Sequence, residues 1–242
     1  MENKGEIMIQ LNVLFEDNHL IVVEKPQNVP SQEDESKDPD LLNMVKNYIK
    51  EKYNKPGNVF VGLVHRLDRP TGGVMVFAKT SKAASRLCEQ IKNGSFEKKY
   101  FAVVNLKPKD SNARLVHFLK KDNKTNIVTQ VPQSEEGAKR CELIYKTLET
   151  NSEISLCDIK ILTGRSHQIR VQMAAIGNPL FGDAKYNGDK LGKGFNLALW
   201  AVQLKFEHPV THQIMSFISY PPEDSIPWKF FNISKYLLIK ST

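Results

Sequence analysis

Segments of this chain that resemble strands outnumber those that resemble helices, and the two kinds follow one another in no regular order. Strand patterns, rich in β-branched residues or alternating in polarity, occupy residues 11–24, 74–78, 99–104, 142–148, 154–162, 197–206 and 214–220. Helical spacing of apolar residues is confined to 41–53, 81–94, 167–176 and a short piece at 228–231. Because no strand–helix–strand unit repeats, the pattern predicts an α+β fold, a mainly antiparallel mixed sheet with flanking helices, rather than a doubly wound one.

Turn and cap residues predict where several of these elements begin and end. Residues 11–24 are expected to form two strands around a turn, and the polar stretch 107–140 to form hairpins or an exposed insertion. Ser81 is the expected N-cap of the second helix, with Cys88 on its inner face, and Ser166 the expected N-cap of the third.

The chain has 242 residues, of which 40% are hydrophobic and 25% charged, as in an ordinary globular protein. No composition break or linker divides it, so residues 1–242 are predicted to be a single domain. No apolar stretch is long enough for a membrane span, and the charged start MENKGE does not resemble a signal peptide. A cytoplasmic protein with no membrane partner is therefore expected.

Histidines and cysteines show no spacing typical of metal ligands. The three cysteines, an odd number, lie far apart, which argues against a disulfide framework and a Cys-rich zinc site. We therefore predict no metal and no metal cofactor, and we expect all three thiols to be buried as small hydrophobic groups.

The excess of positive charge favours a partner rich in phosphate. Lysine plus arginine number 34 against 27 acidic residues, a net charge of +7. Basic side chains bind nucleic acid by releasing counterions from its phosphates. Within the basic stretch 120–124, Lys120, Lys121 and Lys124 are candidates for such contacts, although the same pattern is typical of a solvated face.

The segment HRLDRPTGG at residues 65–73 places one aspartate, Asp68, between Arg66 and Arg69. Neighbouring guanidinium groups favour the ionised carboxylate, and the paired glycines allow close approach of another molecule. The arrangement suits a reaction on an anionic polymer. The alternative is an ordinary ion-paired loop residue beside two glycines that only turn the chain.

A second motif, GRSHQIR at residues 164–170, begins a helix with Arg165 at its start and Arg170 further along. Free N–H groups at a helix start, together with nearby arginines, are typical of an anion site. A capped helix with two solvated arginines explains the same pattern.

These motifs resemble those of the RluA-type pseudouridine synthases. VHRLDRPTGGVMVFAKT is similar to the family's central motif, TGRSHQIRVQMAAIGNPLFGDAKY to its later motif and KKYFAVV to a strand between them. The opening LNVLFEDNHLIVVEKPQNVP is similar to its first strand pair. The resemblance covers residues 11–220 and implies a short form that lacks the S4 RNA-binding domain.

The resemblance implies a role for particular positions in a pseudouridine synthase fold with a central catalytic cleft. Asp68 matches the catalytic aspartate, Arg170 the arginine that pairs with it and Tyr100 the tyrosine that packs on the target uracil. Arg66 matches the arginine that fills the gap left by the flipped base. Arg165 and His167 frame the same motif and are candidate RNA contacts.

Two positions depart from the family's pattern. Gly72 stands where the family most often has serine, and Gln172 where histidine is common. The first departure removes a hydroxyl from the active loop, and the second removes a packing or RNA-facing polar group. Neither touches Asp68, Arg66, Tyr100 or Arg170.

The expected function is the isomerisation of specific uridines to pseudouridine in a stem-loop of tRNA or ribosomal RNA, without a cofactor. Asp68 would attack C1′ as a nucleophile or act as a base at the 2′ carbon, and the sequence leaves both open. A monomer with no obligate protein partner is expected. One alternative is a catalytically silent RNA-binding or ribosome-assembly protein on the same fold, and another is a metal-dependent hydrolase using Asp68 and His65.

Overall fold

The computed structural model describes residues 10–188 and 191–237, and in these residues one sheet of 11 strands runs through the molecule. The strands are β1 (Asn12–Glu16), β2 (Leu20–Lys25), β3 (Gly62–Leu63), β4 (Gly72–Ala78), β5 (Glu97–Asn105), β6 (Asn112–Asp122), β7 (Ile127–Gln130), β8 (Lys139–Thr150), β9 (Ile154–Ile161), β10 (Leu199–Glu207) and β11 (Ile214–Ile218). The helices are α1 (Leu41–Lys52), α2 (Ser81–Asn93), α3 (Gln168–Ala175), α4 (Ser234–Leu237) and the 3-10 turn η1 (Trp228–Phe230).

The strand order is β1-β2-β4-β10-β5-β9-β8-β6-β7, with β11 paired to β10 and β3 to β4. Only β4 and β10 run parallel, and every other pair is antiparallel. The predicted α+β class and mainly antiparallel sheet are therefore confirmed. So are the strand pair at 11–24 and a hairpin within 107–140, which is β6–β7.

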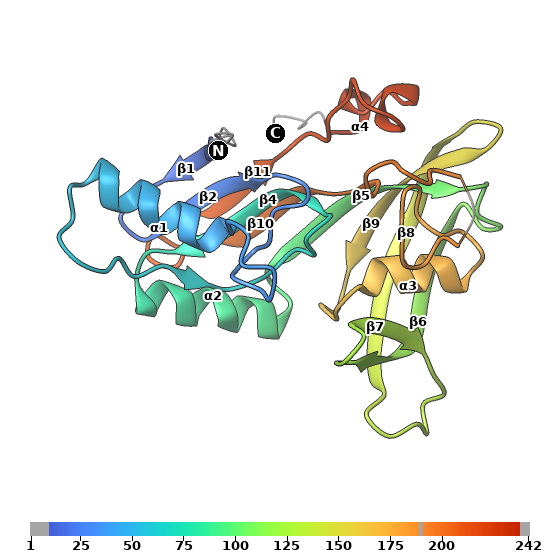
Figure 1. Ribbon diagram of the computed structural model, residues 1–242, viewed down its shortest axis with the longest axis horizontal. Coiled ribbons are helices and arrows are strands. Elements are labelled where there is room, and N and C mark those ends of the chain that lie inside the picture. Colours follow the sequence, from blue (N-terminus) through green and yellow to red (C-terminus); the bar gives the residue numbers. More distant parts are fainter. Residues whose placement is uncertain (1–9, 189–190, 238–242) are drawn as a thin grey trace, which may run out of the picture.

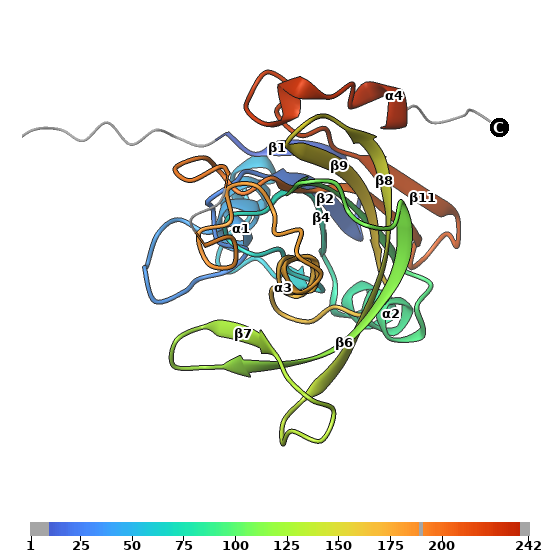
Figure 2. The ribbon, with the colours of Figure 1, turned by 90° about the vertical axis from the view of Figure 1, so that its right-hand side faces the viewer.

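Strand β5 divides the sheet into two halves (Figure 1). One half holds β1, β2, β4 and β10 with α1 and α2. The other holds β9, β8, β6 and β7, curves strongly, and keeps α3 in its concavity, where Figure 2 shows the helix end-on. Apolar residues of α1 and α3 belong to one core on the same face of the sheet. The fold thereby sets the loop before β4 opposite the start of α3.

Two cap predictions were wrong, each by one residue. Helix α2 is capped by Thr80, whose Oγ1 accepts from the Ala83 amide at 3.2 Å, not by Ser81. The buried face of α2 accordingly carries Ala83 and Leu87, and Cys88 is exposed, contrary to the expectation for the thiols. Cys141 and Cys157 are buried as expected.

The start of α3 also differs from the prediction. Its N-cap is His167, in the left-handed conformation (φ 51°), and no side chain caps the helix, so Ser166 does not have the predicted role. The imidazole is instead engaged in a tertiary contact, with Nδ1 at 2.7 Å from the Tyr186 hydroxyl.

Within the described residues, no helix has the length and apolar character needed to cross a membrane.

The two glycines that start β4 lie against the neighbouring strand β10. A Cβ atom on Gly72 would lie 2.1 Å from a ring carbon of Trp200, and one on Gly73 would lie 2.3 Å from the Ala201 carbonyl oxygen. Gly73 also has φ +120°, which side chains disfavour. The chain therefore enters β4 in close backbone contact with β10, and Gly72 leaves room for the indole.

Candidate active site

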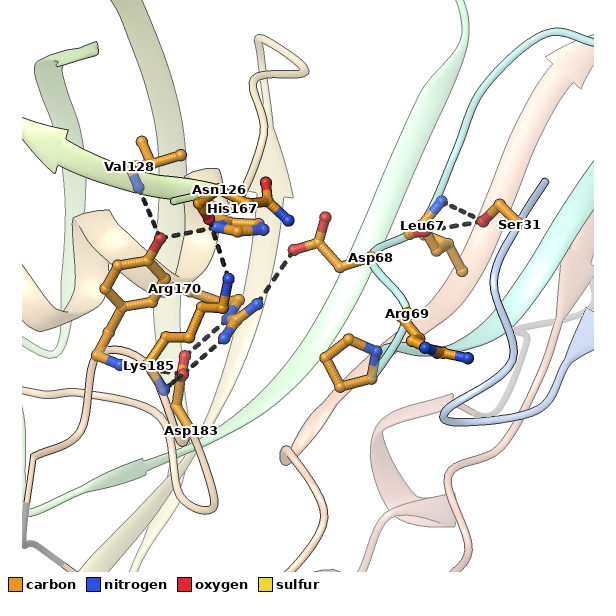
Figure 3. Close-up of polar contacts among 12 residues, drawn as sticks. Ser31, Leu67, Asp68, Arg69, Asn126, Val128, His167, Arg170, Asp183 and Lys185 are labelled. Carbon is orange, nitrogen blue, oxygen red and sulfur yellow. Dashed lines mark hydrogen bonds and ion pairs between the residues drawn. The ribbon is translucent and has the colours of Figure 1, made fainter. Parts of the chain in front are cut away.

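The loop at residues 65–71 carries Asp68 and is held in place by hydrogen bonds from the segment after β2. Ser31 Oγ donates to the Leu67 carbonyl at 2.8 Å and accepts from the Leu67 amide at 3.1 Å (Figure 3). The Asn28 amide donates to the Arg69 carbonyl at 2.9 Å. The residues on both sides of Asp68 are thus fixed through their backbone, which directs the carboxylate toward α3.

Lys25 supplies a further tie from the end of β2. Its Nζ is fully buried and donates to the carbonyls of Pro26 at 3.0 Å, Val29 at 2.6 Å and Arg69 at 2.9 Å. Burial lowers the pKa of Lys25 to about 7, although the negative charge of Asp68 opposes the change. The lysine is therefore a buried anchor of the loop.

The side chain of His65 is buried in the core. Its Nε2 accepts from the Val76 amide at 3.2 Å, and its ring lies 5.6 Å from that of Phe96. Burial lowers the pKa of His65 to about 3, which keeps the ring neutral. Across the residues that the structure describes, no group of three His, Cys, Asp or Glu side chains could hold a metal ion. The hydrolase alternative paired His65 with Asp68, whereas the His65 ring is engaged with Val76 and Phe96.

Among the described residues the carboxylate of Asp68 forms one ion pair, and its partner comes from the other half of the sheet. Arg170 Nη1 on α3 lies 3.6 Å from Asp68 Oδ2 (Figure 3), and the Asp68 side chain is 28% exposed. No described residue donates a hydrogen bond to this carboxylate. Arg69 pairs instead with Asp38, and Arg66 is exposed and forms no ion pair among residues 10–188 and 191–237. The expectation that the adjacent arginines hold Asp68 was wrong, since the cation comes from distant sequence.

Arg170 is itself held by a second carboxylate. Its Nε and Nη2 each donate to Asp183 at 2.7 Å, and its guanidinium lies 5.0 Å from the centre of the Tyr186 ring. Burial alone would lower the pKa of Arg170, but the hydrogen bonds and charge of Asp183, together with Asp68, raise it. Bidentate pairing leaves one nitrogen, Nη1, directed at Asp68.

Tyr100 lies on β5, between the two halves of the sheet. It is buried in the core cluster shared by α1 and α3, and its hydroxyl makes no hydrogen bond within the described chain. Burial, and then the negative charge of Asp68, raise the pKa of Tyr100. The side chain is therefore a neutral phenol that feels the charge of Asp68.

His167 is nearly buried beside Arg170, whereas Arg165 is exposed. Burial lowers the pKa of His167, although the negative charge of Asp68 opposes this. Arg165 Nε donates to the Arg140 carbonyl at 3.3 Å and lies outside the Asp68 cluster. The structure thus brings together Asp68, Arg170, Tyr100 and His167, and leaves Arg66 and Arg165 at the surface.

The three candidate lysines lie on the β6–β7 hairpin, below α3 in Figure 1. Lys120 forms an ion pair with Glu135 at 2.6 Å. Lys121 and Lys124 are exposed, and their ammonium groups form no ion pair within the part of the chain that is described. Lys121 contributes to the positive charge around His167. Two of the three are thus free to contact phosphate, and Lys120 is engaged.

Sequence reasoning missed Asp183, Tyr186, Ser31 and Lys25. The first two stand in the segment FGDAKY that was part of the family resemblance, but nothing local indicates which side chain they hold. Lys25 lies within the opening motif and Ser31 directly after it, and neither has a local pattern that indicates a role. Their contacts depend on long-range folding.

Three comparisons with known proteins bear on this site. The sequence profile described as RNA pseudouridylate synthase matches residues 19–175. An uncharacterized RNA pseudouridine synthase of Bacillus subtilis is 33% identical over 220 residues, 89% of this chain and 74% of the relative. Ribosomal large subunit pseudouridine synthase D of Zymomonas mobilis is 32% identical over 229 residues, 89% and 71% of the two chains. The solved structure of human RNA pseudouridylate synthase domain containing 4 is similar with a TM-score of 0.74, covering 88% of this chain and 89% of that one at 22% identity.

Proposed function

This chain belongs to the RNA pseudouridylate synthase family, and from that premise we propose that it isomerises specific uridines in a tRNA or ribosomal RNA stem-loop, with Asp68 as the catalytic carboxylate. It is an RNA pseudouridine synthase, an isomerase whose substrate is RNA. One observation carries the role of Asp68. Its carboxylate is partly exposed, has a single ion pair of 3.6 Å and accepts no hydrogen bond from the described residues, so its oxygens are available to a reacting nucleotide.

The reaction breaks the N1–C1′ bond of uridine, turns the ring and joins C5 to C1′, with the C5 hydrogen leaving and N1 gaining a proton. Asp68 acts either as the nucleophile at C1′ or as the base at the 2′ carbon, and both roles need an ionised oxygen. Arg170 supplies the neighbouring positive charge that favours this ionised form. The neutral phenol of Tyr100 packs on the uracil face, beside Asp68. No step requires a cofactor.

The target uridine has to leave its stack, which costs a few kcal/mol and is easiest in a loop. Arg66, exposed on the catalytic loop, fills the vacated space in this proposal, and Arg165 and His167 frame the backbone near the flipped base. Lys121 and Lys124 contact phosphates from the hairpin, so binding weakens as salt rises. Lys120 contributes only if it leaves Glu135. The match to ribosomal large subunit pseudouridine synthase D supports ribosomal RNA as one candidate substrate. In this proposal the protein acts in the cytoplasm as a monomer.

The deciding experiment is incubation of the protein with total bacterial RNA, followed by chemical mapping of new pseudouridines. A new modified site, reproduced in an excised stem-loop and insensitive to EDTA while the RNA stays folded, is the expected result. A catalytically silent RNA-binding protein would bind the RNA and produce no new site. Modification only in an assembled ribosomal subunit would contradict recognition of a compact stem-loop.

A further inference from the structure

Three contacts from different parts of the chain meet at Tyr186. Its hydroxyl accepts a hydrogen bond from the Val128 amide of β7 at 2.9 Å and lies 2.7 Å from His167 Nδ1. The face of its ring lies against the guanidinium of Arg170, at 5.0 Å. A single side chain thus touches the hairpin, the N-cap of α3 and the arginine beside Asp68.

The residues next to Tyr186 reinforce this link. Lys185 Nζ donates to the Asn126 carbonyl in the turn of the β6–β7 hairpin at 3.0 Å, as Figure 3 shows. The amides of Lys185 and Tyr186 both donate to Asp183 Oδ1, at 2.9 Å and 3.1 Å. The short segment 183–186 therefore joins the hairpin at one side to the carboxylate that holds Arg170 at the other.

The hairpin also forms the outer edge of its half of the sheet. Among the described strands, β7 pairs only with β6 (Figures 1 and 2). The turn between them carries the exposed Lys124, and Lys121 lies on β6. RNA phosphates bound by these lysines would displace the hairpin. Through their contacts, Tyr186 and Lys185 would carry that displacement to Arg170.

We propose that Tyr186 is a positioning residue, which couples the docking of RNA on the β6–β7 hairpin to the placement of Arg170 beside Asp68. The proposal rests on the function proposed above. The Arg170–Asp68 distance of 3.6 Å exceeds that of a charge-assisted hydrogen bond, which is about 2.8 Å. Docking of RNA on the hairpin shifts Tyr186, and the shift closes this gap.

The test is a double-mutant cycle between Tyr186→Phe and the pair Lys121→Ala/Lys124→Ala, measured on the mapped stem-loop. RNA affinity comes from equilibrium binding, and the chemical step from single-turnover rates at saturating enzyme. The wild-type rate reports the proposed function by itself. Tyr186→Phe keeps the ring against Arg170 and removes only the hydroxyl.

The expected result is that Tyr186→Phe leaves the dissociation constant within about twofold but lowers the single-turnover rate about tenfold. The lysine pair weakens binding and also lowers the saturated rate. The variant that combines Tyr186→Phe with the two lysine substitutions is no slower than the slower of its two parents, because both sets of changes interrupt the same link. If the rate losses of Tyr186→Phe and of the lysine pair multiply in the combined variant, or if Tyr186→Phe keeps the wild-type rate, the coupling is overturned. The activity of the wild-type protein would still be established.

Two further variants guard against a merely structural effect. Tyr236→Phe removes a hydroxyl that donates to the Leu148 carbonyl at 3.2 Å, away from the site, and is expected to keep the wild-type rate. Lys185→Met removes the tie to Asn126 and is expected to show a smaller loss that is likewise absent in the lysine-pair background. If Tyr186→Phe does not fold, as judged by thermal melting, the cycle with Lys185→Met decides.

Discussion

Glu16 and Asp68 are both carboxylates beside cations, yet their surroundings differ completely. At the junction of β1, α1 and β4, Glu16 accepts from Lys52 at 2.7 Å, Lys79 at 2.6 Å, Tyr53 at 2.9 Å and Tyr48 at 3.2 Å, and its side chain is 6% exposed. Asp68 has one cation at 3.6 Å and is 28% exposed. A carboxylate whose acceptor positions are filled holds a fold together, whereas one left unfilled is available for chemistry.

Asp183 extends this contrast within a single cluster. It shares Arg170 with Asp68, but it accepts four hydrogen bonds and its side chain is fully buried. Arg170 thus has on one side a carboxylate that accepts four hydrogen bonds and on the other one that accepts none from the described residues. The number of donors already present, rather than the presence of an arginine, distinguishes the two carboxylates.

The largest effect is expected for Asp68→Asn, which removes the unfilled carboxylate and retains its shape. Turnover should fall by a factor on the order of 10³ or more, because neither nucleophile nor base remains. Pseudouridine formation on the mapped stem-loop, with RNA affinity measured in parallel, checks this. Asp38→Asn, which weakens the surface contacts of Asp38 with Arg69 and Ser36, is the matched control. If Asp68→Asn kept a tenth of wild-type turnover or more, Asp68 would not be the catalytic carboxylate.

Arg170→Lys should lower turnover about 10- to 100-fold, since a point charge replaces a fork that holds Asp183 with two nitrogens and faces Asp68 with the third. Arg170→Ala should lower it further. It should also destabilise the fold by about 3–5 kcal/mol, because Asp183 is left buried without its partner. Single-turnover rates and thermal melting separate the two effects. Full activity in Arg170→Lys would mean that charge alone is required.

Ser31→Ala should lower turnover about tenfold by loosening the loop at Leu67, the residue before Asp68. The hydroxyl satisfies both the amide and the carbonyl of Leu67, so its loss should also cost about 1–3 kcal/mol of stability. Ser155→Ala is a matched control, because that buried hydroxyl donates to the Leu106 carbonyl far from the loop. Equal turnover in the two variants would show that the loop needs no such anchor.

Glu16→Gln is expected to leave turnover unchanged and to alter only the stability of the fold. Burial alone would raise the pKa of Glu16, but hydrogen bonds from Lys52, Lys79 and Tyr53 outweigh it and lower the pKa to about 2. Because this lies below the ordinary value of 4.5, the carboxylate stabilises the fold above pH 4.5 and loses that contribution as the pH falls through 2. Denaturant titrations of the two proteins should differ by on the order of 2 kcal/mol at neutral pH, and the difference should vanish near pH 2. A constant difference across that range would contradict the assignment.

The sheet was predictable because its strands carry their own patterns, and motif similarity pointed to Asp68, Tyr100 and Arg170, which the structure brings close together. The electrostatic partner of Asp68 was not predictable from its sequence neighbours. Arg69 pairs with Asp38, and Arg66 is exposed and forms no ion pair among the described residues. The cation comes from a helix on the other half of the sheet, 102 residues later as the numbers of Asp68 and Arg170 show.

Local rules failed where tertiary contacts compete with them. Ser166 has the right chemistry for an N-cap, but the contact between His167 and Tyr186 shifts the start of α3 by one residue and places His167 in the left-handed conformation. Cys88 follows the apolar spacing of α2, but Ala83 and Leu87 already fill the side that faces the sheet. Ser31 and Lys25 serve the loop through backbone groups, which leave no mark in the sequence.

The contact between Gly72 and Trp200 couples the size of the side chains that these two positions can hold. Replacing Gly72 by the serine common in the family would drive its Cβ into the indole at 2.1 Å. Shrinking Trp200 first would instead leave a cavity, which costs about 3–5 kcal/mol for a large aromatic side chain. Either single substitution is therefore destabilising, and only a paired change would relieve both the clash and the cavity. A mutagenesis library intended to re-engineer this loop should therefore vary both codons together.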